Sequence, residues 1–394
     1  MILGDADDFW SFGGLPTTLP PGGYYYEGLP DALRDDATFA WGLGAYTFNR
    51  YKKKTAKSRP HLFLTDTVDK HALQAKLEAI YLARDLINTP TEAMGPAELA
   101  EKITEVAKKH SATVTQVIGS ELLTAQYLAI HTVGRASVRE PRLIDLRWGS
   151  SQHPKITLVG KGVCFDSGGL NLKSGSGMLL MKKDMGGAAN ALALADLIMA
   201  FNLPVCLRLL IPAVENLVAG NAYKPGDVIP MRNGLHVEVS DTDAEGRLTL
   251  ADALSEASTE QPEILIDFAT LTGAARIALG TEISAFFTRQ NSLATELLEH
   301  SERAQDPLWR LPLYKPYQKL LDSKLADINN TGTSSYAGAI TAALFLSQFV
   351  PESLNWVHID FNAYNVMNRP GRPEGGEAMA ILTLIRYLCE KYVT

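Results

Sequence analysis

Charged side chains with small neighbours gather in three short stretches of the sequence, 160–173, 184–187 and 240–248. Together these stretches hold Lys161, Asp166, Lys173, Asp184, Asp243, Glu245 and Arg247. Carboxylate oxygens in such number suit pairs of divalent ions such as Mg, Mn or Zn. Two ions held about 3.5–4 Å apart can together activate a water molecule and polarise a carbonyl. The residue types therefore indicate a hydrolase with a two-metal site.

A plainer interpretation exists for each acidic stretch. An aspartate just before a helix, such as Asp184, is more often a helix cap than a metal ligand. Asp243 and Glu245 would also suit the positive end of a helix dipole, with Arg247 as a surface partner. Metal binding is favoured because both stretches follow candidate strands. In an extended segment, residues 243 and 245 would also point the same way.

Other reaction types lack their motifs. The sequence contains no HExxH, no GxSxG and no cysteine with a neighbouring histidine. The glycine loop at 160–169 has Phe165 where a dinucleotide motif needs glycine, and no helix pattern follows it at once. His358 lies in an alternating apolar run and is interpreted as a structural strand residue. These absences leave the acidic cluster as the candidate centre.

The segments that must position this cluster alternate between two periodicities. Short apolar runs predict strands at 155–160, 205–211, 235–239, 264–268 and 356–361, and helices are predicted at 188–201, 248–258 and 339–349. This alternation predicts an α/β fold, with a mixed, mostly parallel sheet flanked by helices. Such sheets place ligands at the carboxyl ends of their strands, so the chemistry is expected in strand-to-helix loops.

The chain is long enough for two domains. Apolar residues at helical spacing predict a linker helix over 71–88, which Thr89-Pro90 ends, and a second helix over 96–109. Glycine, proline and aromatic residues over 11–30 predict irregular structure. We therefore expect a small N-terminal α/β domain at 1–70, the linker helix at 71–88 and a large catalytic domain at 89–394.

Composition and charge limit the partners and the compartment expected for this protein. The net charge is −7 and the longest basic run is Lys52–Lys54, which argues against a nucleic-acid surface. Three scattered cysteines form no CxxC pair, so neither a disulfide framework nor a thiolate metal site is expected. The opening residues 1–10 carry three aspartates and no export signal, and the most apolar helix, 188–201, is too short to cross a bilayer. We expect a cytoplasmic protein with no membrane partner.

The chain resembles the leucine aminopeptidases of the cytosol aminopeptidase type, a family of dinuclear metallo-aminopeptidases. The resemblance runs from about residue 82 to the C-terminus. Five ordered blocks carry it: Val159–Gly162 with Phe165–Gly169, Lys173, Asp184–Ala189, Thr242–Leu248 and Ala269–Ala274. It implies an enzyme that hydrolyses the N-terminal peptide bond of peptides with a free N-terminus. It also implies a homohexamer.

The resemblance assigns metal ligands residue by residue. Asp166 and Glu245 would bridge two metals, Asp243 would complete the first site, and Lys161 and Asp184 would complete the second. Lys161 would have to be neutral to act as a ligand. The metals implied are Zn or Mn, with Co or Mg also accepted by such a donor set.

The resemblance also assigns catalytic and substrate-binding roles. Lys173 would act as the electrophile that stabilises the oxyanion, while Arg247 would hold a bicarbonate that acts as base for a metal-bridging water. The substrate groove would be lined by Met181, Thr270, Leu271, Gly273 and Asn362. Met181 also has a plainer interpretation, as filler in the core.

Three departures from the family pattern lie near these blocks. Cys164 stands where threonine is common, and Asp241 where asparagine usually precedes the third acidic block. The segment Asp360–Ala363 contains Asn362, and Asn365 follows closely, where small or apolar residues usually shape the pocket for the first side chain. We therefore expect a more polar pocket and a preference that differs from leucine.

Two other functions stay open on the sequence alone. Some relatives bind DNA, although the acidic balance of this chain counts against that role. A two-metal phosphoesterase would use the same acids but would not need Lys161 as a ligand.

Overall fold

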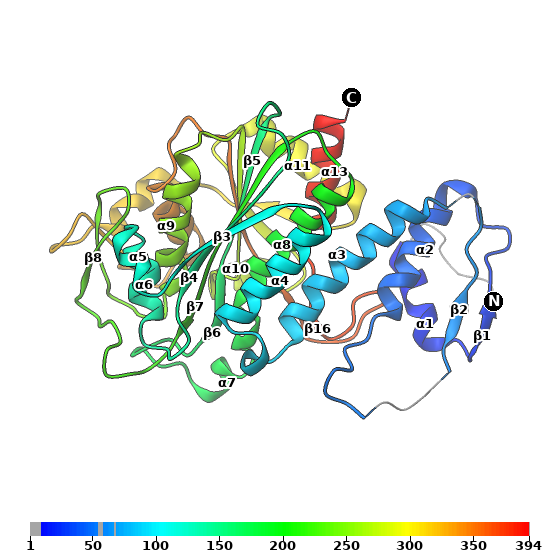
Figure 1. Cartoon of the computed structure of the whole chain (residues 1–394), viewed down its shortest axis with the longest axis horizontal. Helices are drawn as coiled ribbons and strands as arrows, with labels where there is room; N and C mark the ends of the chain where they lie inside the picture. Colours follow the sequence, from blue (N-terminus) through cyan, green and yellow to red (C-terminus); the bar gives the residue numbers. More distant parts are fainter. Residues whose placement is uncertain (1–8, 54–57, 67, 394) are drawn as a thin grey trace.

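The computed structural model describes residues 9–53, 58–66 and 68–393. Residues 1–8, which carry the three opening aspartates, and Lys54 of the basic run lie outside this range. Figure 1 shows a small N-terminal lobe beside a much larger one, with helix α3 (Lys70–Asn88) running from one to the other. This helix occupies the span expected for the linker.

The N-terminal lobe contains both helices and strands. The 3-10 helix η1 (Phe9–Gly14), α1 (Leu15–Thr18) and α2 (Asp31–Ala45) lie beside the parallel pair β1 (Gly22–Tyr24) and β2 (Pro60–Leu62). Phe12, Leu15 and Trp41 form the centre of a small apolar cluster there. The stretch expected to be irregular, 11–30, therefore holds short elements packed on aromatic residues.

The large lobe is built on a sheet in which the described residues form nine strands, in the order β12-β11-β14-β10-β5-β7-β4-β3, with β6 also paired to β7. The four central strands β14, β10, β5 and β7 run parallel to one another. Strand β4 pairs antiparallel with both β7 and β3, and β11 pairs antiparallel with β14. The bounds are β3 Thr113–Ile118, β4 Arg142–Trp148, β5 Lys155–Gly160, β6 Gly162–Asp166, β7 Cys206–Asn216, β10 Ile264–Ala269, β11 Ser284–Phe287, β12 Leu308–Arg310 and β14 Trp356–Asp360. The predicted mixed, mostly parallel sheet is thus confirmed.

Helices cover both faces of this sheet (Figure 1). One face packs against α3, α4 (Pro96–Lys109), α8 (Gly186–Ala200), α11 (Asn291–Ala304) and α13 (Ile381–Tyr392). The other packs against α6 (Leu128–Gly134), α9 (Glu245–Ser258) and α12 (Gly338–Ser347). Along β5, Leu158 and Val159 enter opposite clusters, as the two-residue period of a strand requires. Both faces of the central strands are therefore buried.

Shorter elements complete the lobe. They are η2 (Thr91–Ala93), α5 (Glu121–Thr124), α7 (Gly175–Met178), η3 (Met181–Met185), β8 (Val228–Pro230), β9 (His236–Glu238), α10 (Gly273–Leu279), η4 (Lys315–Leu321), β13 (Ile328–Asn329), β15 (Tyr364–Asn365) and β16 (Gly375–Gly376). Among the described residues, no helix combines the length and apolar character that crossing a membrane requires.

One predicted strand lies in a different sheet. The run at 235–239 forms β9, which pairs with β8 and β13 in a separate three-stranded sheet. The turn between β8 and β9 spans only residues 231–235, so β9 folds back on β8 instead of entering the main sheet. The third acidic stretch, at 240–248, therefore reaches the site from this small sheet.

A buried arginine ties the two lobes together. Arg84 of α3 donates to both oxygens of Glu377, at 3.0 and 3.3 Å. It also donates to the carbonyls of Leu43, at 2.9 Å, and Gly371, at 2.8 Å. Through these bonds Arg84 joins α3 both to α2 of the N-terminal lobe and to the 371–377 loop.

A buried carboxylate holds the start of α6. Asp252 lies on α9, and its Oδ2 atom accepts the amides of Ala129, at 2.8 Å, and Ile130, at 3.1 Å. Burial raises the pKa of Asp252 to about 7, although these amides oppose the shift. The carboxylate therefore serves as a cap for a helix of a different segment.

Asp252→Asn should become more stable relative to the parent as pH rises from 5 to 8. The folded pKa lies above the unfolded one, so the folded parent binds more protons between about pH 4 and 7 and loses up to about 1.4 kcal/mol of stability per pH unit across that window. Asparagine keeps an oxygen for both amides and never ionises. Urea unfolding at pH 5 and pH 8 measures the difference, and exposed Asp322→Asn is the control. Parallel pH slopes in Asp252→Asn and the parent would contradict this account.

Candidate active site and metal centre

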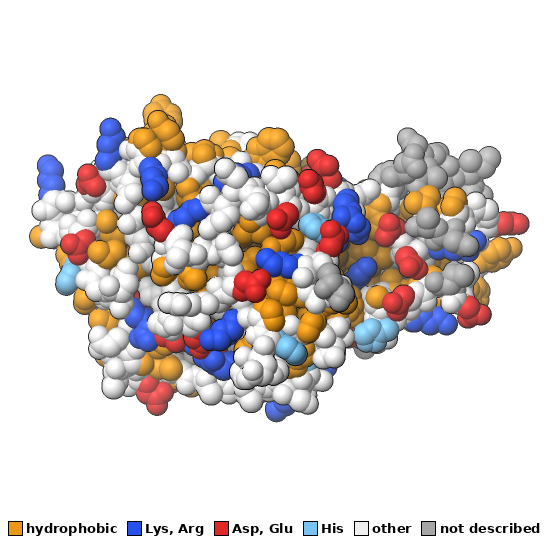
Figure 2. Space-filling view, turned by 90° about the horizontal axis from the view of Figure 1, so that it is seen from above, with side chains coloured by type: hydrophobic (Ala, Val, Ile, Leu, Met, Phe, Trp, Pro, Cys, Tyr) orange, Lys and Arg blue, Asp and Glu red, His pale blue; other side chains and the backbone are white. Residues whose placement is uncertain are grey.

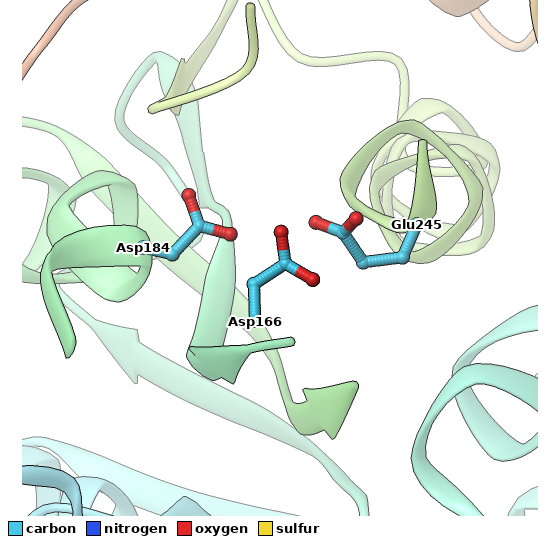
Figure 3. A group of neighbouring side chains, drawn as sticks. All are labelled: Asp166, Asp184 and Glu245. Atoms are coloured by element: carbon cyan, nitrogen blue, oxygen red, sulfur yellow. The ribbon is translucent and has the colours of Figure 1, made fainter. Parts of the chain in front are cut away.

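Three buried carboxylates converge at the carboxyl ends of the central strands. Asp166 ends β6, Asp184 lies in η3 just before α8, and Glu245 is the first residue of α9. One oxygen of each lies within 4.8 Å of the others. Figure 3 shows the three side chains pointing toward one another from three separate elements. The sequence stretches singled out for chemistry are thus brought to one place.

Asp243 and Glu245 reach the site by a different geometry from the one expected. Residues 241–244 form a turn, not an extended segment, and the amide of Asp243 donates to Asp241 Oδ1 at 2.8 Å. The two carboxylates contact different lysines as a result. The expectation of an extended Asp-x-Glu pair was therefore wrong, because α9 begins at Glu245 and the turn redirects the chain.

Two lysines lie among these acids. Lys161 Nζ lies 2.7 Å from Asp184 Oδ2 and 3.0 Å from Glu245 Oε1. Lys173 Nζ lies 2.8 Å from Asp166 Oδ2 and also contacts Asp243. Lys161 is buried, whereas Lys173 is 17% exposed. One lysine is therefore enclosed with the acids, and the other stands at their edge.

Burial and mutual repulsion control how these groups ionise. Burial, followed by the charge of Asp184, raises the pKa of Asp166 to about 6. Burial and the charge of Asp166 raise the pKa of Glu245 to about 7. Burial alone would lower the pKa of Lys161, but the charges of Asp184 and Glu245 outweigh it and raise that pKa. Without metal, the lysine ammonium groups are the cations that keep the acids ionised.

Backbone and amide groups fix the orientation of Asp166. Its Oδ1 atom accepts the amide of Gly168 and the side chain of Asn216, both at 2.8 Å. Gly168 has a left-handed backbone with φ +86°, which favours glycine at this turn. Thr242 then donates to the carbonyl of Gly168 at 2.6 Å. Asn216 was not found in the sequence because β7 runs five residues beyond its predicted end and no motif marks it.

Arg247 is buried next to the acids. Its Nη1 atom donates to the carbonyl of Asn330 at 2.6 Å, and its Nε atom has no hydrogen-bond partner within the described ranges. Burial lowers the pKa of Arg247 to about 10. Asn330, which follows β13, also had no sequence signal. A buried guanidinium with a free donor suits a small anion.

The segment 270–273 is held rigidly beside the cluster. Thr270 donates to Asp184 Oδ1 at 2.8 Å. Asp360 accepts the amides of Leu271, at 2.9 Å, and Thr272, at 3.1 Å, and the hydroxyl of Thr272 at 2.6 Å. Gly273 then opens α10. Met181, also proposed for the substrate groove, is the first residue of η3, in the same short helix as Asp184.

The two asparagines expected in the pocket have structural partners. Asn362 donates to the carbonyl of Tyr364 at 2.6 Å. Asn365 donates to Pro373, at 3.1 Å, and to Glu377, and it accepts from Arg369. Asn365 therefore stabilises the 364–377 loop, and the prediction of a polar pocket has no support from that residue.

A lysine that the sequence analysis passed over lies in this region. Lys183 of η3 is 4% exposed, and its Nζ atom forms no hydrogen bond with the described residues. Burial lowers the pKa of Lys183 to about 7. In the sequence it follows Lys182, and two adjacent lysines are typical of a solvated surface. Only the packing of η3 distinguishes them, since Lys182 donates to the carbonyl of Asn88 at 2.7 Å.

His358 has the structural place expected for it. It is buried on β14, its Nδ1 atom lies 2.6 Å from Asp267 Oδ1, and its ring stacks against Phe287 and Trp356. Trp356, its ring neighbour on β14, belongs to the apolar cluster on the sheet face that α6, α9 and α12 cover.

The donor set fits divalent metal ions. Glu245 Oε2 is buried and accepts no hydrogen bond in the part of the chain that the structure describes. Such an orphaned oxygen, close to two further carboxylates, needs a cation. The residues that could hold metal are Lys161, Asp166, Asp184, Asp243 and Glu245, a set of hard oxygen donors with one amine.

Gly246→Ala should weaken metal binding about 10- to 100-fold, as changes next to metal ligands typically do. A Cβ atom at position 246 would lie 2.4 Å from Lys161 Cε and 2.7 Å from its Nζ atom, so the lysine would have to move. Titration of metal-free protein with Mn or Zn measures the effect. Gly220→Ala is the matched control, because a Cβ atom there meets nothing within 4 Å. Unchanged affinity in Gly246→Ala would mean that Lys161 does not contribute to metal binding.

Comparisons with known proteins agree with this site. Residues 81–385 match the cytosol aminopeptidase family, catalytic domain, and residues 1–65 match the M17 aminopeptidase, N-terminal domain. A probable cytosol aminopeptidase of Syntrophotalea carbinolica is 40% identical over 88% of this chain and 73% of its own length. Peptidase B of an Enterobacter strain is 43% identical over 76% of this chain and 72% of its own.

Solved structures show the same relationship. The crystal structure of cytosol aminopeptidase from Coxiella burnetii superposes with a TM-score of 0.96 at 51% identity, covering 98% of this chain and 85% of that one. The bottromycin maturation enzyme BotP in complex with Mn gives a TM-score of 0.90 at 33% identity, covering 98% and 88%. The buried acids and the matches over nearly the whole chain lead to one conclusion: this protein belongs to the cytosol aminopeptidase family of dinuclear metallo-aminopeptidases.

Proposed function

We propose that this metal-dependent aminopeptidase uses Lys173 as its electrophile and an anion held by Arg247 as its base. The observation that carries the proposal is the buried lysine among the acids. Lys161 contacts both Asp184 and Glu245, which a plain carboxylate site for phosphate esters would not need. The free α-amino group of a peptide is the feature that such a site can recognise.

Membership of the family assigns the ligand roles. Asp166, Asp243 and Glu245 would hold the first ion, and Asp166, Glu245, Lys161 and Asp184 would hold the second. When bound, a pair of divalent ions supplies an activated water and polarises the scissile carbonyl. Lys161 must lose its proton to serve as a ligand, so metal binding releases protons. Zn and Mn are the first candidates, with Co or Mg also possible, and the complex of BotP with Mn supports testing Mn.

Lys173 remains charged at the edge of the acids and would stabilise the oxyanion. Burial alone would lower the pKa of Lys173, but the charge of Asp166 outweighs it, so the pKa is raised. The side chain keeps partial exposure, which leaves its ammonium able to reach a substrate oxygen. A fixed ammonium next to a developing negative charge stabilises the transition state more than the ground state.

Arg247 would hold bicarbonate. When bound, bicarbonate supplies the base that no nearby histidine provides. The free Nε donor of Arg247 would orient the anion, and its Nη1 bond to Asn330 fixes the guanidinium. His358 is not available for proton transfer, since it is enclosed between Asp267 and two aromatic rings.

Substrate binding would combine charge and backbone contacts. Asp184 would receive the free amino group, and Thr270 orients its carboxylate. Leu271, Gly273 and the backbone of Thr270 would line the groove, with Met181 and Asn362 near the first side chain. A requirement for the free amino group makes the reaction an exopeptidase reaction.

Assembly as a homohexamer in the cytoplasm is part of the proposal, on the basis of family membership. Nucleic acid is not among the proposed partners. On the face shown in Figure 2, basic side chains are interspersed with acidic ones and form no continuous stripe.

The proposal predicts hydrolysis of aminoacyl amides and dipeptides after reconstitution with Mn, Zn, Co or Mg in turn. N-acetylated versions of the same peptides should resist cleavage, because the amino group is blocked. Release of the N-terminal residue is measured by chromatography, with a phosphate ester as the comparison substrate. Protein that binds two metals and leaves every peptide intact would disprove the proposal.

Lys173→Ala and Asp166→Ala should separate chemistry from metal binding. Lys173→Ala should keep both metals and lose about 10²- to 10³-fold in kcat, the usual effect of removing an oxyanion donor. Asp166→Ala should lose bound metal, because a bridging ligand is gone. Metal content by elemental analysis and kcat are measured on the same samples. Equal metal loss in the two variants would refute the separate roles.

A further inference from the structure

Thr242 joins the stretch that carries Asp243 to the loop that follows Asp166. Thr242 is fully buried. Its hydroxyl donates to the carbonyl of Gly168 at 2.6 Å and accepts the amide of Asn171 at 2.8 Å. The amide of Thr242 donates to Asn171 Oδ1 at 2.9 Å. These three bonds hold the third acidic stretch, 240–248, against the 168–171 loop.

Two further side chains hold the carbonyl of Thr242. The hydroxyl of Tyr223 donates to this carbonyl at 2.7 Å, and Asn216 Nδ2 donates to it at 3.0 Å. Tyr223 and Asn216 are both buried, so water competes little for these bonds. Every polar atom of Thr242 therefore has a partner, and the partners come from the 168–171 loop, from the end of β7 and from the segment after β7.

Asn216 links the same carbonyl to a carboxylate of the acidic cluster. Its Nδ2 atom also donates to Asp166 Oδ1 at 2.8 Å, so one side-chain amide bridges Asp166 and Thr242. A second route between these residues runs through Gly168, whose amide donates to Asp166 Oδ1 and whose carbonyl accepts from Thr242. Two separate routes of hydrogen bonds thus fix the Asp166 carboxylate relative to Thr242, the residue just before Asp243.

The close approach of these segments requires glycine at position 169. Gly169 has φ +64°, in the left-handed region that favours glycine. A Cβ atom there would lie 2.9 Å from Thr242 Oγ1 and 3.0 Å from Asn216 Oδ1. The loop therefore packs directly against both residues. A buried residue whose polar atoms all have partners makes its surroundings rigid, so the hydrogen bonds of Thr242 favour one arrangement of the two acidic stretches.

We propose that Thr242 is a positioning residue that sets the separation of Asp166 and Asp243 and so forms the first metal site before an ion binds. Asn216 and Tyr223 act through it. This inference rests on the ligand roles of the proposed function, in which both acids hold the first ion. Groups that orient metal ligands typically contribute tenfold or more to the affinity. Ligands that are already in place also spare the ion the entropy cost of ordering them.

The second metal site is held by other contacts. Lys161 and Asp184 would complete it. Thr270 donates its hydroxyl to Asp184 Oδ1 at 2.8 Å, and its carbonyl accepts from Lys161 Nζ at 3.3 Å. Thr242 takes no part in these bonds. Loss of the Thr242 contacts should therefore weaken the first site and spare the second, whereas a general loss of packing would weaken both.

Calorimetric titration of metal-free protein with Mn tests this selectivity. Thr242→Val keeps nearly the same shape and removes the hydroxyl. We expect the affinity for one of the two ions to fall about 10- to 100-fold, while the other ion binds as in the parent. Thr242→Ser retains a hydroxyl and should restore most of the lost affinity. Unchanged binding of both ions in Thr242→Val, equal loss of both, or a Thr242→Ser variant as weak as Thr242→Val would overturn the inference.

Tyr223→Phe is a second variant that keeps the core filled. It removes one bond to the Thr242 carbonyl and should weaken the first ion about fivefold, the usual worth of one hydrogen bond. Tyr26→Phe is the matched control, because the Tyr26 hydroxyl also donates to a carbonyl, that of Ala37 at 3.0 Å, but in the N-terminal lobe. It should bind both ions as the parent does. The same metal affinities in the two variants would contradict the role of Tyr223.

A double-mutant cycle identifies which ion is affected. Asp184→Ala removes a ligand of the second site, and Asp243→Ala removes a ligand of the first. Adding Thr242→Val should lower the remaining affinity in the Asp184→Ala background and leave it unchanged in the Asp243→Ala background. Equal loss in both backgrounds would show that Thr242 supports the fold in general and does not position the first site.

These titrations use no peptide, so they separate this inference from the proposed function. Protein that shows the expected cycle and cleaves no peptide would keep the positioning role of Thr242 while the proposed reaction is lost. Protein that cleaves peptides but loses both ions equally in Thr242→Val would overturn this inference alone.

Discussion

Three carboxylates, those of Asp166, Asp184 and Glu245, are buried with oxygens within 4.8 Å of one another. So much negative charge in a poorly solvated volume is unfavourable unless cations lie among the acids. Lys161 and Lys173 fill that need in the metal-free protein, each contacting two carboxylates. Divalent ions carry more positive charge and therefore compensate the carboxylates better than the lysines do. The same repulsion that raises the pKa values of Asp166 and Glu245 therefore creates the affinity for metal.

This constraint explains much of the surrounding structure. The acids come from separate elements, so β6, η3 and α9 must be held in fixed positions. The parallel strands align their carboxyl ends, and left-handed glycines turn the chain tightly after Asp166. At the start of α9, Gly246 leaves the space that the Lys161 side chain occupies. The contacts that position the acids and Lys161 for activity are therefore also contacts that hold the fold together.

Buried charges in this protein fall into two kinds. Arg84 donates to Glu377 and to the carbonyls of Leu43 and Gly371, and so joins segments that lie far apart in the sequence. Lys183 and the free edge of Arg247 lack partners in the described chain, and both lie beside the acidic cluster. A satisfied buried charge stabilises the fold, whereas an unsatisfied one is costly and is best explained by a ligand.

The sequence by itself determined the fold class and the family, and it predicted the five residues proposed to hold metal. It could do so because strand and helix periods are local, and because the ligands lie in short motifs such as Asp243–Arg247. It did not reveal that 241–244 is a turn, that β9 belongs to a separate sheet, or that Asn216 and Asn330 orient Asp166 and Arg247. Those features depend on contacts between segments that lie far apart in the sequence, such as β9 with β13 and Arg247 with Asn330. Tertiary structure also decided that Lys182 finds a carbonyl while Lys183 is buried without a partner, since adjacent residues on a tight helix face different neighbours.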